Sequence, residues 1–377
     1  MGKLYCPSCG SFYPLNYTGW SCSNCGKPLT VLADIPRLTR DYFKGKGYSV
    51  WRYRDVIPVS GDYIVSLGEG WTPIVTRRVF GLNVLFKLEY LNPTGSFKDR
   101  GSTVVVSRAL SLNVKSIVED SSGNTGLSIA AYGSIAGLKV RVYVPSDIPK
   151  AKKVMLELYG AKVIPSGTRD NASKRAVEEL GEGDYYVGHL WNPFFIEGVK
   201  SIAYEVCEQL EWEPPETIIV PIASGTLILG FYKGFKELYS QKLIDTIPRF
   251  IGVQVEGYTP VYNEFYGEQY RGGISRLADA LRVSKPPRLK EIVSVLRETR
   301  GEVIVVSDSE IVESLKHLVK MGFLVEPSSA TVLAALRKAL NQKIIDRGEK
   351  ILLPLTGSGL KMATQLYSLI YGSGGRT

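Results

Sequence analysis

One lysine, Lys98, stands where a loop-like sequence passes into a helix-like one, and a second turn of small and hydroxyl residues follows it. The first stretch is residues 92–101 (NPTGSFKDRG) and the second is residues 120–126 (DSSGNTG). A lysine amine forms a Schiff base with a carbonyl compound when burial or cationic neighbours lower its pKa. A turn that opens a helix offers backbone N–H groups and hydroxyls to an anion. The pairing predicts a carbonyl cofactor on Lys98 and an anionic substrate group at the second turn.

A third stretch, residues 221–230 (PIASGTLILG), follows a strand candidate and opens a helix candidate. Unpaired amides at such a place suit a phosphate group. The plainer alternative is a strand-to-helix turn that Ser224 or Thr226 caps. Thr356 likewise follows a strand candidate, in residues 356–361 (TGSGLK).

Four cysteines near the N-terminus form two C-x-x-C-G knuckles separated by twelve residues. Each knuckle can place two thiolates on one tetrahedral ion, so we expect structural Zn²⁺ on Cys6, Cys9, Cys22 and Cys25. A segment this short closes no hydrophobic core, and metal binding would supply much of its folding free energy. Disulfides are the alternative, and the sequence shows no export signal that favours them. For Cys207, the fifth cysteine, we expect core packing.

Composition limits the class of protein. At 377 residues, two domains and an appendage are the default expectation, and 44% hydrophobic with 22% charged residues is typical of a globular chain. No apolar run reaches a membrane-spanning length and no secretory leader is visible, so we expect a cytoplasmic protein without a membrane partner. The net charge is +9, but the 46 Lys and Arg are dispersed among 37 Asp and Glu, which argues against nucleic acid. Only two histidines, His189 and His317, are present, which argues against a histidine triad.

The body alternates Val- and Ile-rich strand candidates with amphipathic helix candidates, which predicts parallel sheets covered by helices on both faces. The tail at 372–375 (GSGG) is expected to fray. The strand candidates are residues 84–88, 116–119, 140–144, 162–164, 185–187, 217–220, 250–255, 303–306 and 351–353. The helix candidates include residues 126–136, 150–159, 171–180, 227–238, 309–321 and 330–340.

The ordered set of these motifs resembles the pyridoxal phosphate enzymes of the tryptophan synthase β-subunit group, and within it the threonine synthase family. The resemblance covers nearly the whole chain after residue 66. The motifs, taken in this order, are specific for the fold and the cofactor, and they are less specific for the reaction. Besides the Lys98 stretch and the second turn, the matching segments are residues 68–73 (GEGWTP), 197–200 (EGVK), 325–330 (VEPSSA) and 356–361 (TGSGLK).

The resemblance implies a two-domain α/β structure of fold type II, with parallel or mixed sheets covered by helices and pyridoxal 5′-phosphate in the cleft. Residues 1–30 would form the zinc ribbon, which such chains often carry. Residues 95–200 would form the small domain. Residues 31–94 and 201–377 would form the large, cofactor-binding domain.

The resemblance also implies a role for each site residue. Lys98 would carry the cofactor and then serve as general base and acid. Asn124 would hydrogen-bond the cofactor's 3′-oxygen, although capping of a helix explains it equally, and Thr356 would face the pyridine nitrogen. A neutral hydroxyl there favours elimination over transamination. The cofactor phosphate would lie on Ala223, Ser224, Gly225, Thr226 and Leu227, and the substrate α-carboxylate on Ser121, Ser122, Gly123 and Thr125.

The chain departs from the threonine synthase pattern just before residues 197–200. Where the family places an Asn-Ser pair and an arginine of its phosphate pocket, this sequence has His189-Leu190 and Phe195. Phenylalanine cannot replace a guanidinium clamp on phosphate. Either Lys200 or Arg100 compensates, or the substrate differs. His189 either contacts an anion or is a buried, hydrogen-bonded histidine at a strand end, and for Glu326 we favour a helix cap over a role in the cleft.

The sequence leaves three hypotheses for the function. The first is a threonine synthase that converts O-phosphohomoserine and water to threonine and phosphate, as a cytoplasmic homodimer. The second keeps the cofactor for β-replacement on O-phosphoserine, as in cysteine or cysteate synthases, or for deamination of serine or threonine. The third is a catalytically silent regulatory or RNA-binding protein, against which Lys98, Asn124 and Thr356 argue.

Overall fold

The computed structural model describes residues 2–372, and residues 373–375 of the expected frayed tail lie outside this part. The chain divides by its internal packing into two units. The first comprises Met1–Trp71, Asn92–Thr94 and Lys98–Ser201, and the second comprises Thr72–Leu91, Gly95–Phe97 and Ile202–Thr377. This division groups residues 31–71 with the first unit, whereas the sequence-based boundary grouped residues 31–94 with the larger domain.

The first unit begins with a three-stranded antiparallel sheet in the order β2-β1-β3. Its strands are Gly2–Tyr5 (β1), Phe12–Pro14 (β2) and Thr30–Ala33 (β3), and two 3-10 turns, Val50–Val56 and Gly61–Tyr63, follow. Trp20 joins this N-terminal segment to the rest of the unit. Its ring lies edge-on 4.8 Å from Trp191 and 6.1 Å from Tyr186.

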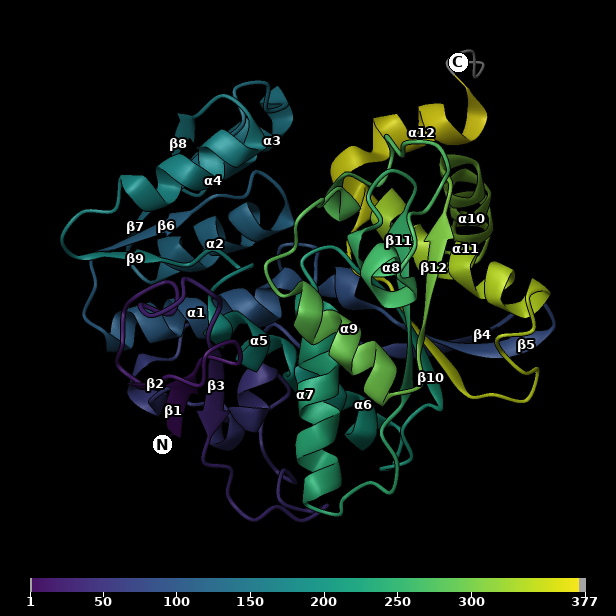
Figure 1. Cartoon of the computed structure of the whole chain (residues 1–377), viewed down its shortest axis with the longest axis horizontal. Helices are drawn as coiled ribbons and strands as arrows, with labels where there is room; N and C mark the ends of the chain where they lie inside the picture. The colour runs from purple at the N-terminus through teal and green to yellow at the C-terminus, as the bar shows by residue number, and fades with distance from the viewer. Residues whose placement is uncertain (1, 373–377) are drawn as a thin grey trace. The chain divides into compact units, whose positions relative to one another are not determined.

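The main sheet of the first unit is parallel, in the order β8-β7-β6-β9 (Figure 1). Successive residues of β6 face opposite sides, as the pleat requires. Ile117 meets Gly133 of α2, whereas Val118 packs with Ala172 of α4. The strands are Ser116–Glu119 (β6), Lys139–Val144 (β7), Lys162–Pro165 (β8) and Asp184–Tyr186 (β9), and the helices are Lys98–Ser111 (α1), Asn124–Ile135 (α2), Lys150–Leu158 (α3), Arg169–Glu178 (α4) and Pro193–Val199 (α5).

The second unit is built on a six-stranded sheet in the order β12-β11-β10-β13-β5-β4, in which only the β4–β5 pair is antiparallel. The sheet is therefore mixed, as the resemblance allowed. Its strands are Ile74–Val79 (β4), Leu82–Lys87 (β5), Thr217–Pro221 (β10), Arg249–Val255 (β11), Glu302–Val306 (β12) and Ile351–Pro354 (β13).

Helices cover both faces of this sheet, and strand β11 shows how the sequence achieves it. The Phe250 ring packs at a tilt beside Phe231 and Phe235 of α7, whereas Ile251 and Val253 join the core that α10 and α11 close. Both faces are apolar because both are buried. The helices are Ser201–Gln209 (α6), Thr226–Ser240 (α7), Pro260–Tyr266 (α8), Leu289–Glu298 (α9), Asp308–Lys320 (α10), Pro327–Asn341 (α11) and Ala363–Tyr371 (α12), with 3-10 turns at Glu89–Leu91, Asp279–Leu281 and Gly359–Met362.

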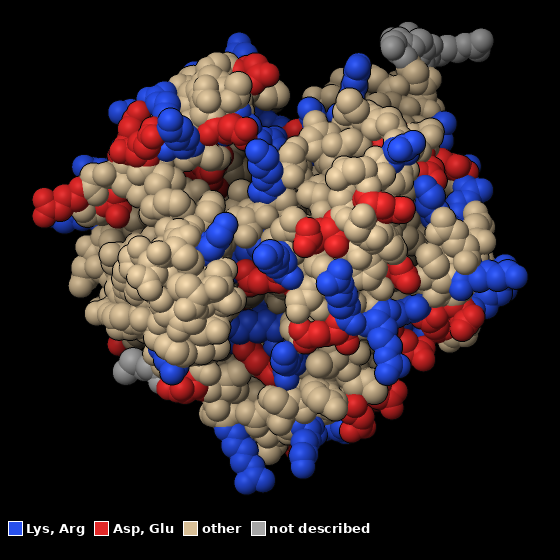
Figure 2. Space-filling model, viewed as in Figure 1, with Lys and Arg blue, Asp and Glu red and all other residues tan. Residues whose placement is uncertain are grey.

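The charged side chains are mixed on the face that Figure 2 shows, with Lys and Arg interspersed among Asp and Glu. Among residues 2–372, no helix is both long enough and apolar enough to cross a membrane.

Candidate active site

Lys98 is the first residue of α1, and a buried carboxylate fixes the start of that helix. Asp99 accepts hydrogen bonds from the Thr94 N–H (2.7 Å) and from the hydroxyls of Thr94 and Ser128 (2.5 Å each). A carboxylate in the first turn of a helix also interacts favourably with the exposed N–H groups there. Burial raises the pKa of Asp99 to about 6. The Thr94–Asp99–Ser128 contacts hold the backbone from which Lys98 projects.

The Lys98 amine is suited to carbonyl chemistry. Burial lowers its pKa to about 7, and the charge of Glu119 opposes that shift. A larger fraction of the amine is then neutral near pH 7 than for an exposed lysine, and only the neutral amine attacks a carbonyl. The amine nitrogen lies 5.5 Å from the centroid of the Phe195 ring.

Phe195 accounts for part of the departure from the family pattern. Its ring is fully buried, and a Cβ on Gly101 of α1 would lie only 2.5 Å from it. Helices α1 and α5 therefore approach closely because glycine faces the ring. The residue that stands where the family has an arginine thus packs against the helix of Lys98 and supplies no charge.

Lys200, a candidate to replace that arginine, is fully buried, and its Nζ lies 2.8 Å from Glu197 Oε2. This ion pair gives Lys200 a structural role within the first unit. Arg100, the other candidate, is also fully buried and donates a hydrogen bond to the Ser201 hydroxyl (3.2 Å). A part for either cation in substrate binding stays a prediction.

The second turn connects β6 to α2 and lies where the sequence predicts. Gly123 precedes the helix and donates its N–H to the Ser121 hydroxyl (3.3 Å). Asn124 is the first helical residue, so it does not itself fill the cap position. A Cβ on Gly126 would lie 1.8 Å from the Ser121 carbonyl oxygen, which shows how tightly the loop crosses the helix. Ser121, Ser122, Gly123 and Asn124 are partly exposed, whereas Thr125 is buried.

Two groups beside this turn have unsatisfied polar atoms. Glu119, the last residue of β6, is fully buried, and within residues 2–372 no hydrogen bond of standard geometry reaches either carboxylate oxygen. His189 Nδ1 has no such bond either, and it lies 3.7 Å from Glu119 Oε1. Burial lowers the pKa of His189 well below its usual value, so the ring is neutral. His189 is therefore buried, as one of its two interpretations requires, and contact with a substrate anion stays a prediction.

In the second unit, residues 223–227 form the turn between β10 and α7. Gly225 has a φ of 85°, and a Cβ there would lie 2.3 Å from Ile292. Both the backbone conformation and the packing therefore require glycine. The hydroxyls of Ser224 and Thr226 are buried and 3.3 Å apart. Ala223 is partly exposed and Leu227 is buried.

Thr356, also in the second unit, pairs with another hydroxyl. Its Oγ1 lies 2.9 Å from Ser329 Oγ, and its carbonyl accepts the Phe97 N–H (3.0 Å). Phe97 immediately precedes Lys98 in the sequence. The backbone hydrogen bond therefore ties the chain next to Lys98 to the residue expected at the pyridine nitrogen. Ser329 lies in residues 325–330, where the sequence predicted a role only for Glu326.

Glu326 does not cap α11 with its side chain as expected. It occupies the N-cap position, but its side chain makes no capping hydrogen bond. Its carboxylate instead lies 3.4 Å from Lys361 Nζ, which also donates to the Gly95 carbonyl (3.3 Å).

The four N-terminal cysteines are brought together, and none is in a disulfide. Their sulfur atoms all lie within 4.8 Å of one another, with Cys6–Cys25 and Cys9–Cys22 each 3.5 Å apart. Four thiolates at this spacing can hold one tetrahedral metal ion. Cys207 is fully buried, as expected for core packing.

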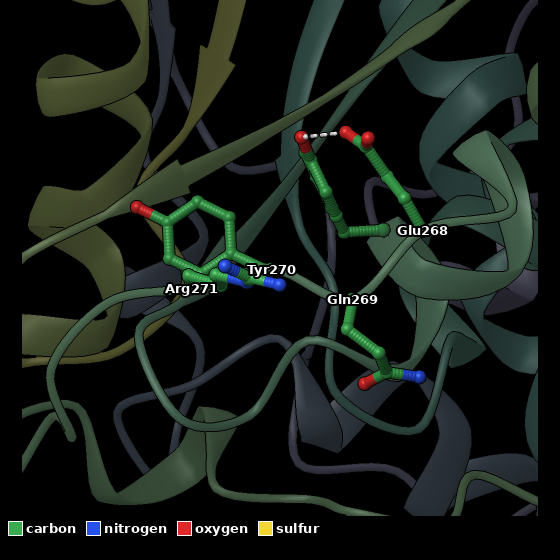
Figure 3. A pocket seen from close by; sticks show the side chains of 5 residues that line it. Glu268, Gln269, Tyr270 and Arg271 are labelled. Carbon is green, nitrogen blue, oxygen red and sulfur yellow. Dashed lines mark hydrogen bonds between the residues drawn. The ribbon is translucent and has the colours of Figure 1, made fainter.

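A surface hollow of about 580 Å³ lies elsewhere in the second unit (Figure 3). In it the Tyr262 hydroxyl donates to Glu268 (3.0 Å). Neither lysine, cysteine nor histidine belongs to its described lining, so it lacks an amine or thiol for carbonyl chemistry. The lining consists of Tyr262, Glu268, Gln269, Tyr270 and Arg271, none of which is a predicted site residue.

Comparison with known proteins identifies the family of the chain. Residues 65–357 match the family model described as pyridoxal-phosphate dependent enzyme. The chain is 36% identical over 374 residues to a threonine synthase of Methanocaldococcus jannaschii, covering 94% of this chain and 92% of that protein. It is 33% identical over 375 residues to a threonine synthase of Methanosarcina acetivorans, covering 96% and 92%.

Solved structures show the same fold. Maize serine racemase superposes with a TM-score of 0.66 at 25% identity, covering 79% of this chain and 91% of that one. A threonine deaminase from T.th. superposes with a TM-score of 0.63 at 26% identity, covering 76% and 92%. The chain belongs to the threonine synthase family of pyridoxal-phosphate dependent enzymes.

Proposed function

We propose that this protein is a threonine synthase that converts O-phosphohomoserine and water to threonine and phosphate. The observation that carries the proposal is the Lys98 amine, which starts α1 with a pKa of about 7 and precedes a tight turn that opens α2. The identity of 36% to a threonine synthase over most of both chains supports the same reaction.

The residues fit pyridoxal phosphate. Lys98 supplies a nucleophilic amine, and the glycine-dependent turn at residues 223–227 supplies backbone N–H groups at the start of a 15-residue helix, where an anionic phosphate is favoured. Asn124 would bind the ring oxygen. Thr356, with Ser329 beside it, would meet the ring nitrogen with neutral hydroxyls.

When bound, the cofactor supplies an electron-withdrawing conjugated ring that stabilises negative charge at the substrate's α-carbon. The chain's own residues then bind the substrate and move its protons. Ser121, Ser122, Gly123 and Thr125 would orient the α-carboxylate at the start of α2. Lys98 Nζ would remove a proton from the substrate carbon and later return it. A neutral partner such as Thr356 would not hold the ring nitrogen protonated, which would favour elimination over transamination.

The residues expected to bind the substrate phosphate differ from those of the threonine synthase pattern. Phe195 offers no charge, and Lys200 is paired with Glu197. This observation favours the second candidate in its deaminase form, deamination of serine or threonine, in which no substrate phosphate has to be bound. The racemase and deaminase folds among the structural neighbours are consistent with it.

A substrate panel tests the choice. The purified enzyme, loaded with pyridoxal phosphate, would be incubated with O-phosphohomoserine, O-phosphoserine, serine and threonine, while phosphate, threonine and oxo-acid release are followed. Stoichiometric threonine and phosphate from O-phosphohomoserine are expected. Oxo acid or β-replacement product from the other substrates, without threonine, would replace the proposal by its alternative.

We further propose that the four-cysteine group binds Zn²⁺ in a structural role, because four protein thiolates leave no open coordination position. Cytoplasmic residence and a homodimer complete the proposal on the strength of the family resemblance. Light scattering of the purified protein would give the oligomeric state directly.

A further inference from the structure

Two hydroxyl groups of the first unit, those of Ser11 and Tyr13, lie against the four-cysteine group. The Tyr13 hydroxyl oxygen is 3.0 Å from Cys22 Sγ, and the Ser11 hydroxyl oxygen is 3.2 Å from Cys9 Sγ. One sulfur of each knuckle is therefore in contact with a hydroxyl. Neither hydroxyl belongs to the thiols that define the proposed zinc site.

Strand geometry explains why both hydroxyls face the cysteines. Ser11 directly precedes β2 and Tyr13 lies within it, and side chains two positions apart along a strand point to the same face. Tyr13 pairs with Leu4, which is buried. Phe12 points to the opposite face, where it is 56% exposed and its ring lies 5.0 Å from Tyr5. The alternation of β2 thus directs the two polar side chains inward and the aromatic one outward.

A further polar side chain lies behind each hydroxyl. Asn24 Nδ2 donates to the Ser11 hydroxyl oxygen (3.0 Å), which leaves the Ser11 proton available for Cys9. Ser23 Oγ lies 3.1 Å from the Tyr13 hydroxyl oxygen. A phenol has one proton, so when Tyr13 gives it to a sulfur, Ser23 is the donor between the two hydroxyls. Both side chains come from between the cysteines of the second knuckle.

Metal binding would fix the direction of these hydrogen bonds. A cysteine that binds a metal has lost its thiol proton, so only the hydroxyl can then donate. Hydrogen bonds to a charged acceptor are stronger than those between neutral groups. We propose that Ser11 and Tyr13 are positioning residues of the metal site, which orient Cys9 and Cys22 and stabilise their thiolates. This inference rests on the proposed zinc site and concerns how tightly that site holds its ion.

Removal of the Tyr13 hydroxyl tests the assignment. Tyr13→Phe keeps the ring, which packs 4.6 Å from that of Tyr17, and removes the donor to Cys22. In competition with a chromophoric chelator, we expect this variant of the full-length protein to bind Zn²⁺ at least about tenfold more weakly than wild type. Ser11→Ala should weaken binding by about threefold or more, because its contact with sulfur is longer and more exposed.

Cobalt provides a readout that a general loss of stability would not change. Co²⁺ can replace Zn²⁺ in a tetrahedral thiolate site, and its absorption spectrum includes charge transfer from sulfur to the metal. A hydrogen bond to a thiolate lowers the energy of the sulfur electrons. The charge-transfer band of the Co²⁺-loaded protein should therefore move to longer wavelength in Tyr13→Phe.

The matched control is Tyr17→Phe. It makes the same change in the same segment, but the hydrogen bond that it removes is to the Ser21 carbonyl (3.1 Å). Zn²⁺ affinity and the Co²⁺ band should both stay as in wild type. An unchanged affinity or an unshifted band in Tyr13→Phe, or equal changes in Tyr17→Phe, would overturn the assignment. Wild-type protein that binds neither ion would instead contradict the proposed zinc site.

Discussion

The two groups of predicted site residues differ in how their polar atoms are satisfied. Around Lys98 the first unit buries ionisable groups with shifted pKa values, and within residues 2–372 the Glu119 oxygens and His189 Nδ1 make no hydrogen bond of standard geometry. Around Thr356 and residues 223–227 the second unit presents neutral hydroxyls that contact one another, and a glycine turn fixed by packing. Under the proposed function, the ionisable groups of the first unit would carry the cofactor and transfer protons, whereas the hydroxyls and the turn of the second unit would bind the cofactor's ring and phosphate.

Removal of the Lys98 amine is expected to have the largest effect. Lys98→Ala should lower turnover by at least about 1,000-fold, because both Schiff-base formation and proton transfer need that nitrogen. Absorbance near about 410–430 nm, expected of the bound cofactor, should also disappear. Lys139→Ala, at an exposed lysine of the same unit, is the control and should retain both. Normal turnover by Lys98→Ala would refute the assignment of proton transfer to this residue.

Removal of the proposed metal tests whether the N-terminal segment stabilises the site residues of the first unit and leaves those of the second unit unaffected. Cys22→Ser should lose the metal and change the fluorescence of Trp20, which packs on Trp191 and Tyr186. We expect KM for the amino acid to rise about tenfold, with little change in cofactor affinity, because Tyr186 interacts with Asp120 beside the substrate turn.

The matched control for that experiment is Cys207→Ala, which alters a buried cysteine outside the four-cysteine group. Elemental analysis should find one zinc per chain in this control and none in Cys22→Ser. Full zinc occupancy in Cys22→Ser would show that the other three cysteines suffice.

The pH dependence of cofactor loading tests the lowered pKa of Lys98 in the first unit. Only neutral Lys98 reacts with the aldehyde, and its pKa is about 7. The rate at which cofactor-free protein regains its visible absorbance should therefore rise about tenfold per pH unit below pH 7 and level off above it. Stopped-flow absorbance would measure this. A rate that keeps rising up to about pH 10 would indicate an ordinary, unshifted lysine.

The smallest expected effect concerns the turn of the second group. Gly225→Ala should destabilise the protein by about 1–3 kcal/mol and weaken cofactor binding, since Gly225 has a positive φ and the added Cβ would overlap Ile292, only 2.3 Å away. Gly267→Ala provides a matched control, because Gly267 also has a positive φ (72°) but no atom within 4 Å of the added Cβ. Chemical denaturation and cofactor titration of both variants would show how much packing against Ile292 contributes to stability and to cofactor affinity. Equal behaviour of the two variants would show that the contact with Ile292 is unimportant.

Much of the fold follows from local sequence patterns. The Val- and Ile-rich runs at 217–220 and 250–255 become β10 and β11, because strands buried on both faces are apolar throughout. Strand β4 has no such signal. Its central residues are exposed and polar, and it forms as the antiparallel edge partner of β5. Edge pairing depends on the neighbouring strand and not on the run itself.

The candidate site was predictable where chemistry and spacing coincide, as at Lys98 and the four cysteines. Glu119 was not predicted, since in the sequence it is only the last residue of a strand candidate. It stands out only in the folded chain, because long-range packing buries it and leaves its oxygens without a hydrogen bond of standard geometry among residues 2–372. The Thr356–Ser329 contact joins residues 27 positions apart and likewise needs the tertiary fold.

Borohydride reduction tests the central claim most directly, because it fixes the cofactor to the nitrogen that carries it. After reduction of the cofactor-loaded enzyme and proteolysis, mass spectrometry should find the pyridoxyl group on the peptide that contains Lys98. Labelling of a different lysine, or of none, would contradict the account.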